Sequence, residues 1–490
     1  MKKIHLLIIS LVALLVFGAY LTEKEKTHRS LNVVATNYAV SEFAKNIAGE
    51  EATVTLVSEQ DQAKSKQADV LIYQHESSDD WVMKVQKDWD NQAPKLVSGT
   101  KDTVLLAAAH DEHNHSHSHS HGDEAAHVHD LDTTIYLSPQ RAMTEVTKIK
   151  EQLIAYYPDK ADVFEKNASN YLEQLQQLDT DYTNAFNQAP QKSFVTQNDS
   201  FTYLALDYGL KQIKVTDIYS NVKPSASRLA ELKTYVAENH IPYIYFDQLI
   251  DNDFNQTLSS EANVQAAFLN PLTQASSKDY LTLMKENLLA LQKTTEIAGD
   301  AFKPEHEEVP VQTVAQGYFK DDAVKDRTLS DYAGDFQSVY PYLQNDMLDP
   351  VFDYKSKLNQ TMSAAEYKDY YTVGYKTDVD HLLITGDTMA FKVGDNRYQY
   401  HYQYDGYQIL NYKKGNRGVR FMFKTDDPNA GRFKYVQFSD HAIAPQQAEH
   451  FHIYFGGESQ SKLLEELDNW PTYYHSDLSG LEVAQEMVAH

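Results

Sequence analysis

The stretch FSDHAIAPQQAEHFHIYFGG, residues 438–457, decides how the C-terminal part of this chain is interpreted. Because side chains alternate along a strand, His450 and His452 are expected to share one face, with Phe451 on the other. An antiparallel neighbour across the proline-containing connection brings His441 back beside this pair. Three imidazoles from two adjacent strands suit Zn²⁺, which accepts neutral nitrogen donors in tetrahedral geometry with a fourth position open. The alternative is an exposed strand with surface histidines.

Length and composition limit the class of protein. A chain of 490 residues is too long for one ordinary core, so two domains of roughly 150–300 residues are expected. A hydrophobic content of 42% with 23% charged residues is typical of folded, soluble protein. The formal charge of −26 argues against nucleic acid as a partner, because phosphate binding needs clustered Lys and Arg. An acidic surface suits a protein that meets cations.

The first 21 residues, MKKIHLLIISLVALLVFGAYL, join two lysines to an apolar run. This pattern predicts an export signal or an N-terminal membrane anchor. Cysteine is absent, so the chain has no disulfides and no cysteine to carry a lipid. We therefore expect an extracytoplasmic protein at the cell surface, either membrane-anchored through this segment or secreted.

Residues 31–297 show strands alternating with helices in two series, which predicts two α/β lobes with parallel sheets. Ser138 and Pro139 open a helical stretch between the two series, as N-cap and first helical residue. This helical character continues to about Gln188. Its second part repeats large apolar residues every three to four positions, so we expect a rigid spine helix that links the lobes.

A histidine-rich insert occupies residues 110–130 of this module. Alternating His and Ser with acidic flanks cannot build a core, so we expect a surface loop. Dense imidazole predicts weak chelation of Zn²⁺, Ni²⁺ or Cu²⁺ by many ligand pairs, although a solvated tract without a role is the alternative. The histidines concerned are His110, His113, His115, His117, His119, His121, His127 and His129.

An acidic stretch with two prolines, residues 298–312, has no periodic apolar face and is interpreted as a linker. Residues 313–490 are rich in tyrosine and contain short alternating segments separated by Gly, Asp and Asn. This pattern predicts an antiparallel sheet closed into a barrel.

Particular segments of residues 313–490 closely resemble a ZinT-type domain. They are GYFKDDAVKDRTLSDYAGDFQSVYPYL, KKGNRGVRFMF, YVQFSDHAIAP, AEHFHIYFGG and DNWPTYYHSDLSG. The resemblance implies a calycin-like β-barrel that binds zinc through three histidines near its mouth. It implies His441, His450 and His452 as the ligands, in agreement with the spacing argument.

Residues 31–297 resemble the ZnuA-like zinc-binding subunit of an ABC importer, in the stretches VTQNDSFTYLALDYGL, PSASRLAELKTYV and IPYIYFDQ. This module followed by a ZinT-like domain is the order of AdcA-type surface zinc-binding proteins. The resemblance implies a metal in a cleft between two lobes and delivery of zinc to a membrane permease.

The cleft ligands implied by this resemblance are replaced in this sequence. The loop that carries the first histidine is missing, Thr134 and Asn198 stand at the next two histidine positions, and Thr273 stands at the acidic position. Hydroxyl and amide groups are poor donors for Zn²⁺ compared with imidazole. We therefore expect a degenerate cleft, unless His75 or Asp132 substitutes.

Three hypotheses follow for the function. The first is an extracytoplasmic protein that captures Zn²⁺ for an ABC-type uptake system, with affinity that falls as pH drops through roughly 6–7. The second is a docking or adhesion scaffold whose first module no longer carries metal. The third is a zinc enzyme with Asp440 or Glu449 as base, which the exported context disfavours, so we expect no enzyme. Imidazole donors leave copper and nickel open as alternative metals.

Overall fold

The chain forms two compact units in the computed structural model. One consists of Met1–Lys101 and Ala108–Phe302, and the other of Asp102–Ala107 and Lys303–His490. The described residues are 30–89, 93–108, 131–215, 226–247, 252–297, 313–314, 316–412 and 415–489. The predicted export segment (1–21), histidine-rich loop (110–130) and linker (298–312) lie outside these ranges. None of the helices in the described ranges has the length and apolarity needed to cross a bilayer.

The first unit contains two four-stranded parallel sheets, in the orders β2-β1-β3-β4 and β6-β5-β7-β8. The predicted two-lobed α/β architecture is thereby confirmed. The strands are β1 (Leu31–Ala35), β2 (Ala52–Leu56), β3 (Val70–Tyr73), β4 (Lys95–Ser98), β5 (Ser193–Thr196), β6 (Lys211–Lys214), β7 (Tyr243–Phe246) and β8 (Gln265–Phe268).

Helices flank these sheets and begin at recognisable signals. The Asn37 side chain accepts a hydrogen bond from the backbone of Val40 at the start of α2, and Asp279 does the same from Thr282 at α10. The helices are α2 (Tyr38–Ala48), α3 (Gln62–Lys66), α4 (Asp80–Val85), α5 (Pro139–Tyr156), α6 (Ala161–Asn187), α7 (Thr202–Asp207), α8 (Ala226–Glu238), α9 (Asn252–Ala262) and α10 (Tyr280–Thr295), with 3₁₀ turns η1 (Gly49–Glu51), η2 (Glu59–Asp61), η3 (Gln86–Asp88), η5 (Thr134–Leu137) and η6 (Pro158–Lys160).

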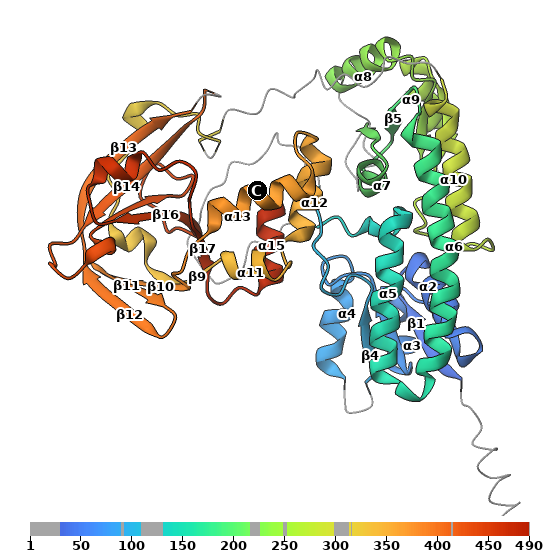
Figure 1. Ribbon diagram of the computed structural model, residues 1–490. Coiled ribbons are helices and arrows are strands. Elements are labelled where there is room, and N and C mark those ends of the chain that lie inside the picture. Colours follow the sequence, from blue (N-terminus) through green and yellow to red (C-terminus); the bar gives the residue numbers. More distant parts are fainter. Residues whose placement is uncertain are drawn as a thin grey trace, which may run out of the picture. The chain divides into compact units, whose positions relative to one another are not determined.

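The predicted spine is α6, which runs along both lobes beside α10 (Figure 1). Its large apolar side chains, from Phe164 to Phe186, are all buried in the principal core of the unit. The helical stretch that opens at Pro139 is not continuous, because it breaks between α5 and α6 at Tyr157–Lys160. Pro158 has no backbone N–H and disfavours a helical conformation in the residue before it, which ends α5 there.

The second unit is built on a nine-stranded antiparallel sheet in the order β12-β11-β10-β9-β17-β16-β15-β14-β13. The edge strands β12 and β13 are consecutive in the sequence, and no hydrogen-bonded ladder is found between their described residues. This half-barrel sheet confirms the predicted calycin-like fold. The strands are β9 (Gly334–Ser338), β10 (His381–Thr385), β11 (Thr388–Val393), β12 (Asn396–His401), β13 (Gln403–Asn411), β14 (Arg417–Lys424), β15 (Tyr435–Ser439), β16 (His450–Gly456) and β17 (Thr472–His475).

Aromatic rings fill the concave core of this sheet. Tyr332 stacks on Phe438 with ring centres 4.2 Å apart, and Phe451 meets both Phe438 and Phe336. The helices of the unit are α11 (Tyr340–Gln344), α12 (Asp349–Asn359), α13 (Ala364–Tyr375), α14 (Gln460–Leu464) and α15 (Gly480–Ala489), with 3₁₀ turns η7 (Asp321–Ala323), η8 (Leu329–Tyr332) and η9 (Gly431–Phe433).

Candidate metal centre

The three predicted histidines lie at the end of the β15–β16 hairpin. These two strands pair antiparallel, and Ser439 at the end of β15 stands opposite His452. Phe451 is fully buried in the aromatic core, whereas His450 and His452 project from the other face of the sheet and are half-buried. The strand alternation expected from the sequence is therefore present. The histidine pair lies on the face that is turned away from the core.

His441 lies just beyond β15 and is exposed. Its φ of 43° is in the left-handed region, so the chain turns sharply there. Its ring centre lies 5.7 Å from that of His450 and 6.2 Å from that of His452. The structure thus brings the three predicted residues into one neighbourhood, which we call the histidine pocket.

The rings of the histidine pocket are slightly too far apart for simultaneous coordination. Zn–N bonds of roughly 2.0–2.1 Å in tetrahedral geometry place imidazole ring centres about 5 Å apart. Within the described ranges, no group of three or more His, Cys, Asp or Glu side chains is arranged to hold a metal ion as it stands. Coordination therefore requires His441 to approach the pair by about 1 Å, a movement that an exposed side chain on a turn makes readily.

Thr472 orients His452 from the neighbouring strand. The threonine Oγ1 lies 2.7 Å from His452 Nδ1 and donates its own hydrogen to the carbonyl of Trp470 at 3.1 Å. Because that hydrogen is used, Oγ1 accepts the hydrogen of Nδ1. The Nε2 lone pair of His452 is then available as a metal donor. No signal in the sequence points to Thr472, because only the pairing of β16 with β17 places it beside His452.

The surroundings of His452 favour the neutral imidazole. Burial, the neighbouring His441 and the Arg420 guanidinium lower the pKa of His452 to about 3. The edge of the ring also contacts Trp470, with centres 5.3 Å apart. A neutral imidazole is the form that binds zinc, so this ligand needs no deprotonation at neutral pH.

Arg327 fixes the connection that carries His441. The arginine is fully buried, and its Nη1 donates to Asp440 Oδ1 at 2.5 Å while its Nη2 donates to the carbonyl of Gln446 at 2.7 Å. Its guanidinium also lies over the Tyr332 ring at 4.4 Å. Both ends of the connection are thereby held by one side chain, which the sequence reasoning also missed.

The two carboxylates considered as catalytic bases lie in different surroundings. Asp440 is buried against Arg327, and burial raises its pKa to about 6 although the guanidinium opposes the shift. Glu449 is exposed at the start of the strand pair. The geometry of the histidine pocket therefore supports binding of a cation.

Two of the implied cleft positions of the first unit, Thr134 and Asn198, make hydrogen bonds to other residues of the protein. Thr134 opens η5, and its Oγ1 lies within hydrogen-bonding distance of Asp132 Oδ1, at 2.5 Å, and of the carbonyl oxygen of Ser200, at 2.9 Å. Asp132 also accepts from the backbone N–H of Thr134 at 2.9 Å. Asn198, which is buried, donates to Asp247 and accepts from the hydroxyl of Ser200 at 2.7 Å. We call this group the lobe junction.

Thr273 and His75 are not joined to the lobe junction by any described contact. Thr273 is exposed. His75 is half-buried, and its Nδ1 interacts with the hydroxyl and the backbone N–H of Ser77 at 2.8 and 3.0 Å. Asp132 does lie there, and its carboxyl group is already bonded to Thr134. Burial raises its pKa to about 7 against the effect of those bonds.

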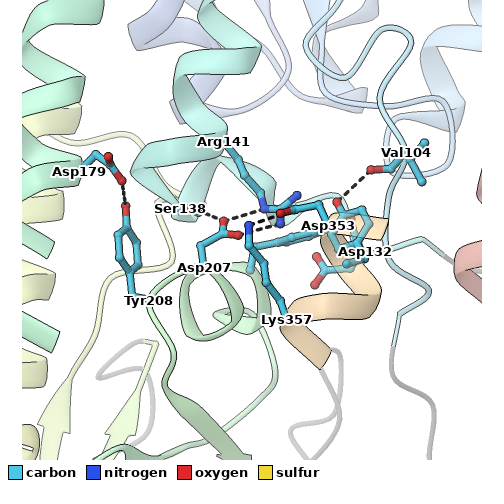
Figure 2. Close-up of polar contacts among 11 residues, drawn as sticks. Val104, Asp132, Ser138, Arg141, Asp179, Asp207, Tyr208, Asp353 and Lys357 are labelled. Atoms are coloured by element: carbon cyan, nitrogen blue, oxygen red, sulfur yellow. Dashed lines mark hydrogen bonds and ion pairs between the residues drawn. The ribbon is translucent and has the colours of Figure 1, made fainter. Parts of the chain in front are cut away.

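Further polar contacts join the lobes around these residues. The Tyr203 hydroxyl donates to the carbonyl of Asp132 at 2.7 Å in a buried setting. Arg141 forms a two-point ion pair with Asp207, at 2.7 and 2.8 Å, and Ser138 donates to the same carboxylate at 2.7 Å (Figure 2). Hydrogen bonds within the protein thus engage the polar groups of Thr134 and Asn198, two of the implied ligand positions.

Family models match both units of the chain. The ZinT model, "ZinT (YodA) periplasmic lipocalin-like zinc-recruitment", matches residues 310–490, and the ZnuA model, "Zinc-uptake complex component A periplasmic", matches residues 33–294. The class of protein is therefore a ZnuA-like solute-binding module joined to a ZinT-like module. The resemblance inferred from the sequence segments is confirmed.

Relatives match over the full length. The zinc-binding lipoprotein AdcA of Streptococcus pneumoniae (strain ATCC BAA-255 / R6) is 49% identical over 100% of both chains. The zinc-binding protein AdcA of Streptococcus pyogenes serotype M3 is 46% identical, again over 100% of both. The crystal structure of Zn(II)-bound AdcA from Streptococcus pneumoniae covers 94% of this chain and 100% of its own, with a TM-score of 0.83 and 48% identity. The chain belongs to the AdcA family of zinc-binding proteins.

Proposed function

We propose that this protein captures Zn²⁺ outside the cytoplasm for an ABC-type zinc uptake system, with the histidine pocket as its main metal site. The observation that carries the assignment is the convergence of His441, His450 and His452 from adjacent strands, with His452 neutral and oriented by Thr472. Zinc is the cargo, and the open fourth position leaves room for water or an incoming donor. Family membership and the zinc-bound relative support zinc as the ion.

The first unit serves delivery in this proposal. Its fold is that of a solute-binding module, so its partner is the membrane permease of the importer. The polar groups of Thr134 and Asn198 form hydrogen bonds inside the protein, which supports a lobe junction that holds no metal. The eight histidines of the tract at 110–130 act as a weak collector of ions around the main site.

Location follows the same reasoning. An extracytoplasmic place suits capture of zinc before import, and the apolar segment at residues 1–21 provides membrane association or export. No cysteine exists to carry a lipid, in contrast to the relative that is named a lipoprotein.

Two other hypotheses are set aside. The chain is not an enzyme, because its full-length relatives are zinc-binding proteins and its first unit belongs to a solute-binding family. The docking or adhesion scaffold is not favoured for the same reason.

The test of the main site is the double variant His450→Ala with His452→Ala in the full chain. Removing two of three donors lowers zinc affinity by at least about 100-fold in a competition titration against a chromophoric chelator. The matched control removes two strand histidines of the same sheet outside the pocket, His381 and His401. The same pair of variants with residues 110–130 deleted removes the background of weak chelation. Unchanged tight binding in the double variant rejects the assignment.

A further inference from the structure

A short segment between two elements of the first unit belongs to the second unit. Residues Asp102–Ala107 follow β4 and precede η5, both of the first unit, yet they are part of the second unit. Three consecutive residues of this segment are buried, with Val104, Leu105 and Leu106 exposing 4%, 0% and 7% of their surface. An extended segment on an open surface exposes alternate side chains, so burial of three in succession indicates a segment that is enclosed.

The backbone of this segment is held by side chains of two helices. Gln485 of α15 donates from Nε2 to the carbonyl of Leu105 at 2.6 Å and accepts from the N–H of the same residue at 2.8 Å. Its amide group therefore takes the place that a neighbouring strand would have. The Tyr354 hydroxyl of α12, itself buried, donates to the carbonyl of Val104 at 3.0 Å (Figure 2, where Val104 is labelled).

This pattern satisfies the requirements of specific peptide recognition. Backbone groups that leave water need partners, and here both groups of Leu105 and the carbonyl of Val104 have them. Recognition of an extended peptide usually combines such main-chain bonds with burial of apolar side chains. Both contributions are present at one place.

We infer that the face formed by α12 and α15 is a docking site for an extended apolar peptide, and that its occupant is the chain's own segment Val104–Leu106. The segment acts as a strap that attaches the connection between β4 and η5 to the second unit. The chain thereby enters that unit twice, through the strap and through the connection at Phe302–Lys303. In the sequence, the histidine-rich tract begins at His110, shortly after the strap.

The strap is tested in the full chain with a protease site inserted between residues 303 and 312. After cleavage the covalent connection is lost, and the docked strap keeps the two fragments together in size-exclusion chromatography at micromolar concentration. Leu105→Asp places a charge in the enclosed position and releases the fragments. The control Leu467→Asp makes the same change at a leucine that is 59% exposed and leaves them associated.

A second measurement covers the case in which Leu105→Asp prevents folding. In the uncut chain, Gln485→Ala removes the acceptor of the Leu105 amide, so its hydrogen exchange becomes at least 10-fold faster, while Gln408→Ala at an exposed position leaves it unchanged. Separation of the wild-type fragments after cleavage overturns the inference. So does exchange at Leu105 that is insensitive to Gln485→Ala.

Discussion

The histidine pocket of the second unit and the lobe junction of the first each contain a threonine with a different role. In the pocket the threonine supports a histidine, and in the lobe junction it stands where the resemblance implies a histidine. Thr472 gives its hydrogen to a backbone carbonyl and uses a lone pair to hold His452. Thr134 uses its hydroxyl to bridge Asp132 and Ser200. One threonine holds a proposed zinc ligand in place, and the other makes contacts within the protein at a position where the resemblance implies a ligand.

This difference shows that residue type alone does not define a metal site. A hydroxyl group that hydrogen-bonds to the second nitrogen of an imidazole makes that imidazole a better metal ligand, because it fixes the ring orientation and the tautomer. A hydroxyl group in place of an imidazole leaves neighbouring polar groups to be satisfied, and the lobe junction satisfies them internally. The comparison predicts that disturbance of the first environment changes zinc affinity, whereas disturbance of the second changes only stability.

The largest expected effect on the histidine-pocket side comes from Arg327→Ala. The variant leaves Asp440 buried without its cation, which costs about 3–5 kcal/mol of unfolding free energy in the second unit. It also releases both ends of the connection that carries His441, so zinc affinity falls. Urea unfolding monitored by Trp470 fluorescence, with Trp81 and Trp89 replaced by phenylalanine, measures the change.

Arg397→Ala is the matched control for this variant, because Arg397 is exposed on β12. Its substitution changes stability by less than about 0.5 kcal/mol. An Arg327 variant as stable as this control contradicts the role of the buried ion pair.

Glu145→Gln probes the first unit through pH. Burial raises the pKa of Glu145 to about 8, and its one described partner is Gln74, which donates to Oε1 at 3.1 Å. The folded state thus holds a proton that the unfolded state releases near its ordinary value of about 4.5. Stability is therefore lost as pH rises from about 4.5 to 8, and the glutamine variant, which cannot ionise, avoids this loss.

The expected gain from Glu145→Gln is near zero at pH 4.5 and reaches about 2–4 kcal/mol at pH 8. Denaturant unfolding of the first unit at both pH values measures it. The exposed Glu173 provides the matched control Glu173→Gln. Zinc affinity at constant pH stays unchanged in both variants. A gain that is equal at the two pH values contradicts the buried proton.

Thr472→Val sharpens the comparison on the histidine-pocket side. Loss of the oxygen that holds Nδ1 of His452 weakens zinc binding by about 10-fold. The control is Thr388→Val, which removes a hydroxyl group 3.1 Å from Nδ1 of His401, a histidine outside the pocket. Competition titration compares the two, and equal affinities show that Thr472 does not position a ligand.

Thr134→Val is expected to leave zinc binding unchanged, which makes it the variant with the smallest effect on zinc. The variant removes the bond to Asp132 and the bridge to Ser200, so the first unit loses about 1–2 kcal/mol of stability. Zinc stoichiometry, measured by native mass spectrometry, stays the same as in the unchanged chain. Loss of one tightly bound zinc assigns a metal to the lobe junction and breaks the comparison.

The sequence predicted those features that have a local period or a local motif. The spine stripe from Phe164 to Phe186 and the alternation in β16 follow from spacing alone. The break at Pro158 was also present in the sequence, as a residue that cannot continue a helix, and the prediction of helical character to Gln188 overlooked it.

The features that escaped prediction depend on partners far away in the chain. Arg327 meets Asp440 across 113 positions, and Leu105 meets Gln485 across 380. The sequence around each of these residues gives no sign of its partner, because only the folded structure brings the two together. The segment DTVLLAAA containing Leu105 is apolar, yet its sequence does not say which surface covers it.

The proposed donor set has a consequence for oxidising conditions. All three donors of the histidine pocket are imidazole nitrogens, and the chain contains no cysteine. Thiolate ligands are lost when peroxide converts them to sulfenic acid or to disulfides, and their metal is then released. A site of imidazoles is exempt from this chemistry. The protein is therefore suited to keep collecting zinc at times of oxidative attack, when thiolate-based stores give theirs up.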